Sequence, residues 1–99
     1  VIWDQPTSIR VEGGTAINNL DVYPNPSRDI FNVSFISETK QSIEVRVVNL
    51  VGEIIFTETL ENFEGEYTKS FNLSEYSKGV YILELDTDYG IVNKKLILQ

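Results

Sequence analysis

Residues 78–99 read KGVYILELDTDYGIVNKKLILQ, and this stretch decides the fold. The apolar side chains of its first half share one face of a predicted strand and are expected in the core: Tyr81, Leu83 and Leu85. A polar turn ending in Gly90 follows, which is typical of a β-hairpin. A second strand is predicted from Ile91 to Leu98, so the sequence closes on an apolar strand rather than on a polar tail.

Five segments upstream of this hairpin also have the features of strands. They alternate in polarity or are rich in β-branched and aromatic residues, and turn signals separate them roughly every 8 to 12 residues. The predicted strands are 20–23, 30–37, 43–48, 53–60 and 66–72, with turns at 24–26, 38–41, 49–52 and 62–65. The pattern predicts an all-β fold, an immunoglobulin-like antiparallel β-sandwich of about seven strands. A jelly roll or a small barrel has the same pattern and remains an alternative.

Charge and composition exclude several classes of function. The 99 residues are the length of one domain, and their net charge is −7, whereas a nucleic-acid partner would need a basic surface. The chain contains no histidine and no cysteine, so it lacks the commonest general base, the commonest zinc ligand and a thiol nucleophile. We therefore predict no enzyme activity, no metal and no cofactor. The sequence also contains no apolar run long enough to predict a membrane span.

The first part of the chain differs from the rest. We interpret residues 1–19 as a linker or as the end of a preceding domain, and residues 20–99 as the folded domain, because glycine and proline interrupt the first part. Proteases cut most readily in exposed linkers and loop tips. Gly13 and Gly14 are therefore the candidate cleavage region, and a cut is expected within residues 11–19.

Four short motifs occur in order within the predicted domain: LDVYPNP at 20–26, VRVVNLVG at 45–52, GVY at 79–81, and Gly90 followed by KKLIL at 94–98. In this combination the chain resembles the C-terminal sorting domain of the type IX secretion system of Gram-negative bacteria, the Por secretion system. It departs from that family at Glu53, where Gln or Lys is common, and at Gln99, where a basic residue is common. The resemblance implies an immunoglobulin-like fold of seven strands.

The resemblance also implies a role for the domain, which is a signal and catalyses nothing. Such a domain directs a secreted cargo protein, joined upstream in the same chain, across the outer membrane through the type IX translocon. The cargo passes through the periplasm in transit and then reaches the cell surface or the medium. A sortase-like peptidase commonly removes the sorting domain there. The motif residues expected to have a structural role are Leu20, Val22, Tyr23, Pro24, Asn25, Pro26, Gly52, Gly79, Val80, Tyr81 and Gly90.

The end of the sequence is the predicted recognition site. An apolar edge strand offers backbone groups to which a partner adds a strand, and neighbouring lysines would set the register. The residues expected to contact the translocon are Lys94, Lys95, Leu96, Ile97, Leu98 and Gln99. The alternative is that Lys94 and Lys95 only protect an edge strand from aggregation.

A different class of function is also compatible with the sequence. The chain would then be a carbohydrate- or protein-binding β-sandwich appended to an extracellular enzyme. Such a module needs an exposed aromatic platform, and the candidates are Tyr67, Tyr76 and Tyr89, which lie in different segments.

Overall fold

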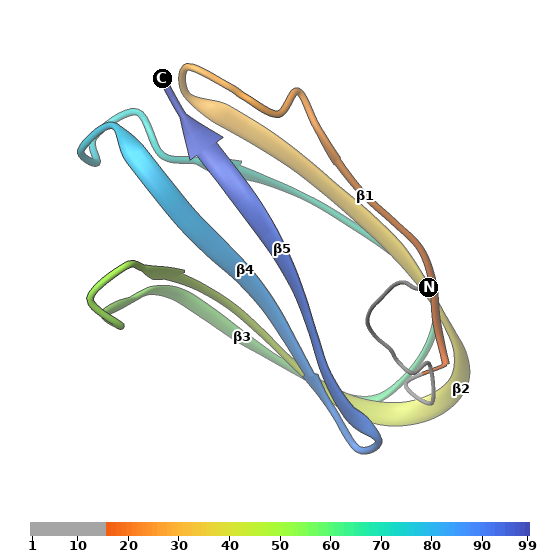
Figure 1. Cartoon of the computed structure of the whole chain (residues 1–99). Coiled ribbons are helices and arrows are strands. Elements are labelled where there is room, and N and C mark those ends of the chain that lie inside the picture. Colours follow the sequence, from red (N-terminus) through yellow and green to blue (C-terminus); the bar gives the residue numbers. More distant parts are fainter. Residues whose placement is uncertain (1–15) are drawn as a thin grey trace, which may run out of the picture.

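The computed structural model describes residues 16–99, and every regular element in that part of the chain is a β-strand (Figure 1). The strands are β1 (Ile17–Tyr23), β2 (Ile30–Asn49), β3 (Ile54–Asn72), β4 (Gly79–Thr87) and β5 (Gly90–Leu98). All four strand pairings are antiparallel. The prediction of an all-β, antiparallel fold is therefore confirmed.

The predicted seven separate strands of a sandwich are not confirmed, because the model has five strands in one sheet. β2 has 20 residues and β3 has 19, and each runs through a predicted turn, 38–41 in β2 and 62–65 in β3. The pairing of the two strands shifts register between Ser37 and Ile43. Extra residues in a bulge bend a strand without ending it. At the polar segments 38–41 and 62–65 the strands therefore bend but do not end.

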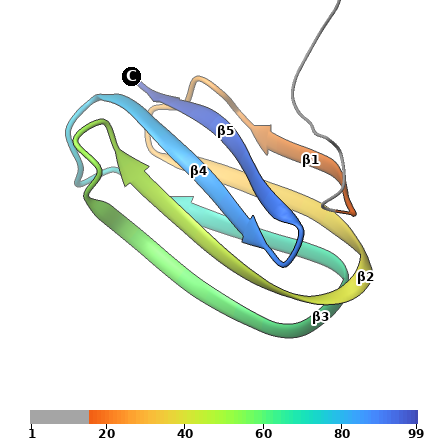
Figure 2. The ribbon, with the colours of Figure 1, turned by 60° about the horizontal axis from the view of Figure 1, so that its bottom comes forward.

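The bend folds the sheet over on itself. The first part of β2 pairs with β1 and the second part pairs with β4, while β3 follows the other edge of β2 along its length. Figure 2 shows β2 and β3 curving together around one end of the molecule, with β4 and β5 crossing over them. The strand order along the main path is β1-β2-β4-β5.

The core lies between the two halves of this folded sheet. Because strand side chains alternate, every second residue of β2 and β4 points inward. The buried apolar residues are Val22, Phe31, Val33, Phe35, Ile43, Val45, Val47, Tyr67, Phe71, Leu73, Tyr81, Leu83, Leu85, Leu96 and Leu98. The ring of Phe35 on β2 stacks on the ring of Tyr67 on β3, with ring centroids 4.8 Å apart. The expected burial of Tyr81 is confirmed.

The first strand begins earlier than the sequence predicts. β1 starts at Ile17, three residues before Leu20, and the amide of Glu38 donates a hydrogen bond to the carbonyl oxygen of Ala16 over 2.9 Å. Of the residues assigned to a linker, 17–19 thus belong to a paired strand. Gly13 and Gly14 lie outside the described residues.

Candidate functional site

Of the predicted recognition residues, 94–98 form the second half of β5, which pairs with β4 at one edge of the sheet, and Gln99 follows the strand. Leu96 and Leu98 point into the core and are 0% and 2% exposed, so their side chains cannot be reached in the folded domain. Ile97 lies between them on the outer face and is partly exposed. The structure therefore divides the predicted site into core residues and surface residues.

The two lysines of the site are both exposed but lie on opposite faces of the sheet. Lys94 is opposite Leu83 and so lies on the core-facing side, while Lys95 is opposite Ile82 on the outer side. A charge that faces inward on an edge strand prevents another strand from adding there. Lys94 therefore fits the protective role, whereas Lys95 is available to a partner on the outer face.

The outer edge of β5 is covered by the segment 24–27, which connects β1 to β2. The amide nitrogen of the Asn25 side chain donates to the carbonyl oxygen of Lys95 over 2.8 Å, and its carbonyl oxygen accepts from the amide of Ile97 over 3.0 Å. The backbone amide of Ser27 donates to the carbonyl oxygen of Ile97 (2.9 Å), and the backbone carbonyl oxygen of Ser27 accepts from the amide of Gln99 (2.8 Å). Segment 24–27 thus acts as a short neighbouring strand for the last residues of β5.

The structure brings three of the four sequence motifs together around β5. Asn25 comes from the first motif, Gly79 and Tyr81 of the third are paired with Leu98 and Leu96, and Gly90 begins β5 itself. The Tyr81 hydroxyl donates to the carbonyl oxygen of Ser77 over 2.5 Å, which satisfies its polar end. The other residues of the first motif divide between core and surface: Val22 is buried, Leu20 is partly buried, and Tyr23, Pro24 and Pro26 are exposed.

The second motif forms the turn between β2 and β3, and one side chain organises it. The Asn49 side-chain oxygen accepts from the amides of Val51 (3.1 Å) and Glu53 (2.9 Å), and its nitrogen donates to the Glu53 carboxylate (2.7 Å). Gly52 has φ of +89°, a conformation that favours glycine. The turn is therefore held in one shape by its own hydrogen bonds.

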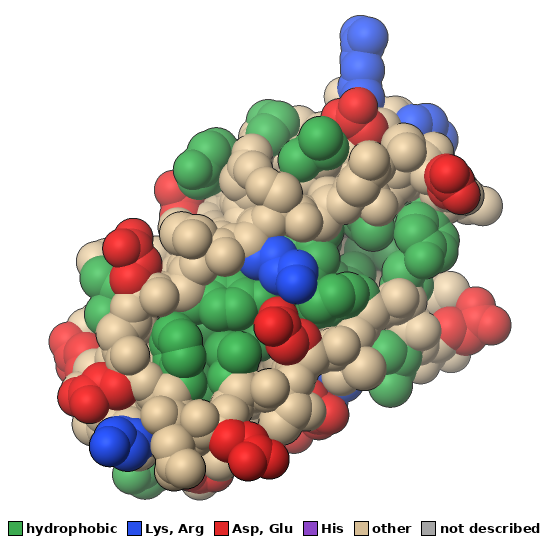
Figure 3. All heavy atoms as spheres, turned by 180° about the vertical axis from the view of Figure 1, so that it is seen from behind, with side chains coloured by type: hydrophobic (Ala, Val, Ile, Leu, Met, Phe, Trp, Pro, Cys, Tyr) green, Lys and Arg blue, Asp and Glu red, His purple; other side chains and the backbone are tan. Residues whose placement is uncertain are grey.

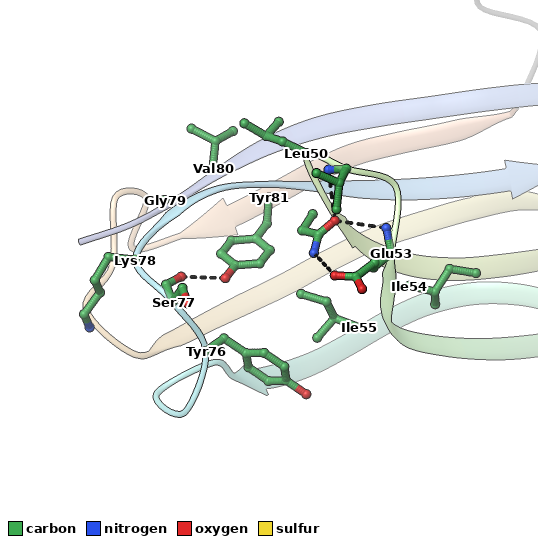
Figure 4. Close-up of a pocket in the computed structure, with 12 residues that line it drawn as sticks. Leu50, Glu53, Ile54, Ile55, Tyr76, Ser77, Lys78, Gly79, Val80 and Tyr81 are labelled. Atoms are coloured by element: carbon green, nitrogen blue, oxygen red, sulfur yellow. Dashed lines mark hydrogen bonds between the residues drawn. The ribbon is translucent and has the colours of Figure 1, made fainter.

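This turn borders an open depression of about 610 Å³ at the end of the sheet (Figure 4). Leu50 and Val51 stand at its rim and are 71% and 81% exposed. Tyr76, Lys78 and Val80 of the β3–β4 connection and β4 line the other side. Sequence reasoning did not select Leu50 and Val51, although two apolar residues inside a turn, where polar ones are usual, are a detectable signal.

The outer face of β2 and β4 carries a cluster of charged side chains around Arg46. Arg46 of β2 donates from Nε to Glu84 over 3.1 Å, from Nη2 to Asp86 over 3.4 Å, and also contacts Glu44. The hydrogen bond with Glu84 is the largest cause that raises the pKa of Arg46, with smaller contributions from Glu44 and Asp86. These carboxylates are therefore occupied by a neighbour within the domain.

The inward face of β3 also carries charge. Glu58 lies in the first half of β3 and Lys69 in the second half, and the Lys69 ammonium is 3.6 Å from the Glu58 carboxylate. The same ammonium lies 5.0 Å from the centre of the Phe56 ring. Apolar side chains gather in the middle of the face seen from behind in Figure 3, with a basic and an acidic side chain over them. Inward-facing charges of this kind on an edge strand disfavour pairing of the β3 edge with a strand of another molecule.

The three tyrosines proposed as an aromatic platform do not come together. Tyr67 is buried in the core, Tyr76 lies beside the depression, and Tyr89 lies in the β4–β5 turn at the other end of the nine-residue β4. A strand of that length spans about 27 Å. No observation in the described part of the chain therefore favours a carbohydrate platform built from these residues.

Residues 16–99 contain neither a metal-binding cluster nor a helix that could span a membrane. No group of three or more acidic side chains there is arranged to hold a metal ion. No helix in that part of the chain is long and apolar enough to cross a membrane.

Comparison with known proteins gives the context of this arrangement. A family model described as "Secretion system C-terminal sorting domain" matches residues 21–99. An endo-acting ulvan lyase of Formosa agariphila is 28% identical over 89 residues, which are 89% of this chain and 16% of that enzyme. Beta-agarase D of Zobellia galactanivorans is 28% identical over 96 residues, 96% of this chain and 18% of that enzyme. The chain thus spans less than a fifth of the length of either relative.

Proposed function

Because this chain belongs to the family of secretion system C-terminal sorting domains, we propose that it directs an attached cargo protein across the outer membrane through the type IX translocon. The observation that carries the proposal is the joining of the first motif to the last strand by Asn25 and Ser27. This arrangement presents the end of β5 as an ordered strand. An ordered signal binds with a smaller entropic cost than a flexible tail.

The domain acts in this proposal by binding and without catalysis. Its partners are the outer-membrane translocon, a sortase-like peptidase that removes the domain, and the cargo joined upstream. The relatives are named as polysaccharide-degrading enzymes and are several times longer than this chain, which supports an extracellular enzyme as the cargo. The domain would pass through the periplasm and reach the cell surface or the medium.

We place removal of the domain upstream of β1. The backbone from Ile17 is paired with β2, and Ala16 is hydrogen-bonded to Glu38, so a peptidase would have to open the sheet to cut there. Gly13 and Gly14 therefore remain the proposed cleavage region. Mass spectrometry of the mature cargo would locate the new carboxyl terminus, and a cut at or after Ile17 would contradict the proposal.

The function is tested by fusing the whole chain to a reporter that carries an export signal for the inner membrane. In a bacterium with a type IX system, we expect the reporter at the cell surface. In the same strain without its outer-membrane translocon, we expect it to stay in the periplasm. Equal surface delivery in both strains, or periplasmic retention in both, would contradict the proposed function.

A further inference from the structure

One half of the outer sheet face is apolar and runs across β3, β2 and β4 to the end of β5. Its outward-facing residues are opposite one another in the pairing: Ile54 with Val48, Val48 with Ile82, and Val80 with Ile97. Leu50 and Val51 extend this row at the β2–β3 turn. We call this surface the apolar stripe and define it by Val48, Leu50, Val51, Ile54, Val80, Ile82 and Ile97.

The turn residues of the stripe have no role in the core. In the described chain, Val51 and Leu50 are the most exposed of the large apolar side chains, and Ile54 is also exposed. They border the open depression, where Tyr76 adds an exposed aromatic ring (Figure 4). A contiguous exposed apolar surface of this kind on a folded domain marks an interaction site.

The turn that displays these side chains is preformed. The Asn49 side chain holds the amides of Val51 and Glu53 and the Glu53 carboxylate, and the amide of Gly52 donates to the backbone carbonyl oxygen of Asn49 over 3.0 Å. A surface already in its binding conformation loses little conformational entropy when a partner covers it. The hydrogen bonds thus position two apolar side chains toward solvent, which folding alone does not require.

Charges around the stripe indicate the chemistry of the partner. Lys95 lies opposite Ile82 at the end of the stripe, and Lys78 lines the depression. Within residues 16–99 neither ammonium has a carboxylate at ion-pair distance; the Lys78 ammonium donates to the backbone carbonyl oxygen of Arg28 over 3.0 Å. The Glu53 carboxylate, which lines the same depression, accepts a hydrogen bond from the Asn49 side chain. A complementary surface would therefore be apolar at its centre and acidic at its rim.

We propose that the apolar stripe is the surface through which the domain docks onto the secretion machinery, on a partner surface that is apolar with an acidic rim. This inference rests on the proposed function and specifies where the recognised surface lies. The stripe meets the last strand at Ile97 and Lys95, so one partner can contact both. The recognised surface then includes the second and third motifs as well as the end of the sequence.

The test uses the whole chain fused to the reporter described above. Leu50→Ser with Val51→Ser removes the most exposed apolar groups and keeps Asn49 and Gly52, which hold the turn. The matched control is Tyr89→Ser with Ile91→Thr, which removes two exposed apolar side chains, 59% and 56% exposed, at the β4–β5 turn and the start of β5. We expect surface delivery to fall about tenfold or more for the first variant and to stay unchanged for the control.

Two further measurements make the outcome decisive. Circular dichroism and thermal melting of each variant must match the original chain; if the double variant is less stable, Val51→Ser alone replaces it. Lys78→Glu with Lys95→Glu should also lower delivery, because it would repel an acidic rim.

These experiments separate a failure of the proposed function from a failure of the proposed docking surface. If the original fusion does not reach the surface, the proposed function is wrong. If it does and the folded Leu50/Val51 variant is delivered equally well, the stripe is not the docking surface, and contact with the natural cargo becomes its explanation. If the original chain dimerises in solution and the variant does not, the stripe is a contact between two copies, and the inference is overturned.

Discussion

The side chain of Asn25 accepts a hydrogen bond from the amide of Ile97, which lies 72 residues further along the chain. The same side chain donates to the carbonyl oxygen of Lys95, so its amide group imitates a peptide unit of an adjacent strand. Paired backbone groups at an edge are satisfied without a further strand. The short Pro24-Asn25-Pro26 motif therefore holds the end of β5, although the two are distant in sequence.

Asn25→Ala should loosen the end of β5 while leaving the core intact. The loss of two hydrogen bonds at a solvent-accessible edge is expected to lower the free energy of unfolding by about 1–3 kcal/mol. Hydrogen exchange at the Ile97 amide should become faster, and chemical denaturation should report the lower stability. Asn93→Ala is the matched control, since Asn93 is an exposed asparagine of the same strand. Equal exchange at Ile97 in both variants would contradict the role of Asn25.

Tyr81→Ala should destabilise the domain strongly, because Tyr81 is buried and lies opposite Leu96. Truncation of a large buried aromatic residue costs about 3–5 kcal/mol. Tyr81→Phe keeps the packing and loses only the bond to Ser77, so it should cost about 1 kcal/mol. Denaturant unfolding of the two variants measures both values. Similar losses for Ala and Phe would show that the hydroxyl, rather than the ring, stabilises this site.

Deletion of residues 94–99 should unfold the domain. Leu96 and Leu98 are core residues, and removal of each is expected to cost at least as much as truncation to alanine, about 2–5 kcal/mol. Their sum is comparable to the 5–15 kcal/mol that typically stabilises a whole domain. Circular dichroism of the deletion variant would show loss of strand signal. A cooperative melt near the original temperature would mean that β5 contributes little to the core.

The charges of the two lysines can be tested without unfolding. Lys94→Glu and Lys95→Glu change exposed side chains, so each should alter stability by no more than about 0.5 kcal/mol. Because only Lys95 lies on the outer face, Lys95→Glu should reduce surface delivery of a fused reporter more than Lys94→Glu does. Equal effects of the two variants would contradict the assignment of separate roles to the two faces.

Stability should fall in alkaline solution because of Tyr67. Burial raises the pKa of Tyr67 above its ordinary value, and the hydrogen bond of 2.7 Å to Glu58 and the Glu58 charge add to this effect. Protonated Tyr67 therefore stabilises the fold fully below the pKa of tyrosine in the unfolded chain, about 10. This stabilisation is lost as the pH rises above that value. Tyr67→Phe should flatten the decline in unfolding free energy between about pH 9 and pH 11. The exposed-site control Tyr89→Phe should leave that decline unchanged.

The alternation of the sequence was sufficient to predict the strands and their inner faces. Phe31, Val33 and Phe35 of β2 are all buried, as is the set on β4 that includes Leu83. The burial of these side chains follows from the alternation of apolar and polar residues along each strand, which is a local property of the sequence. The sequence also shows turn signals at 38–41 and 62–65, but whether such a stretch bends or breaks depends on pairing with another strand.

The candidate site was predicted only in part, for the same reason. The end of the sequence was selected, yet alternation along β5 alone did not show that Leu96 and Leu98 would be inaccessible in the core. The contacts of Asn25 with Lys95 and Ile97 join residues about 70 positions apart, and no local pattern reports them. The sequence signal at Leu50 and Val51 is a pair of apolar residues inside a turn, which the backbone conformation of the turn does not explain.

The burial of Leu96 and Leu98 also links this domain to its own synthesis. β5 is the last strand of the domain to leave the ribosome, and until then Tyr81 and Leu83 lack their neighbours on that side. A polypeptide that breaks off before Leu96 cannot complete this core and carries no ordered strand for a receptor to bind. Under the proposed function, export would be restricted to molecules translated to the end of the domain, so the fold would act as a check on complete translation of the cargo.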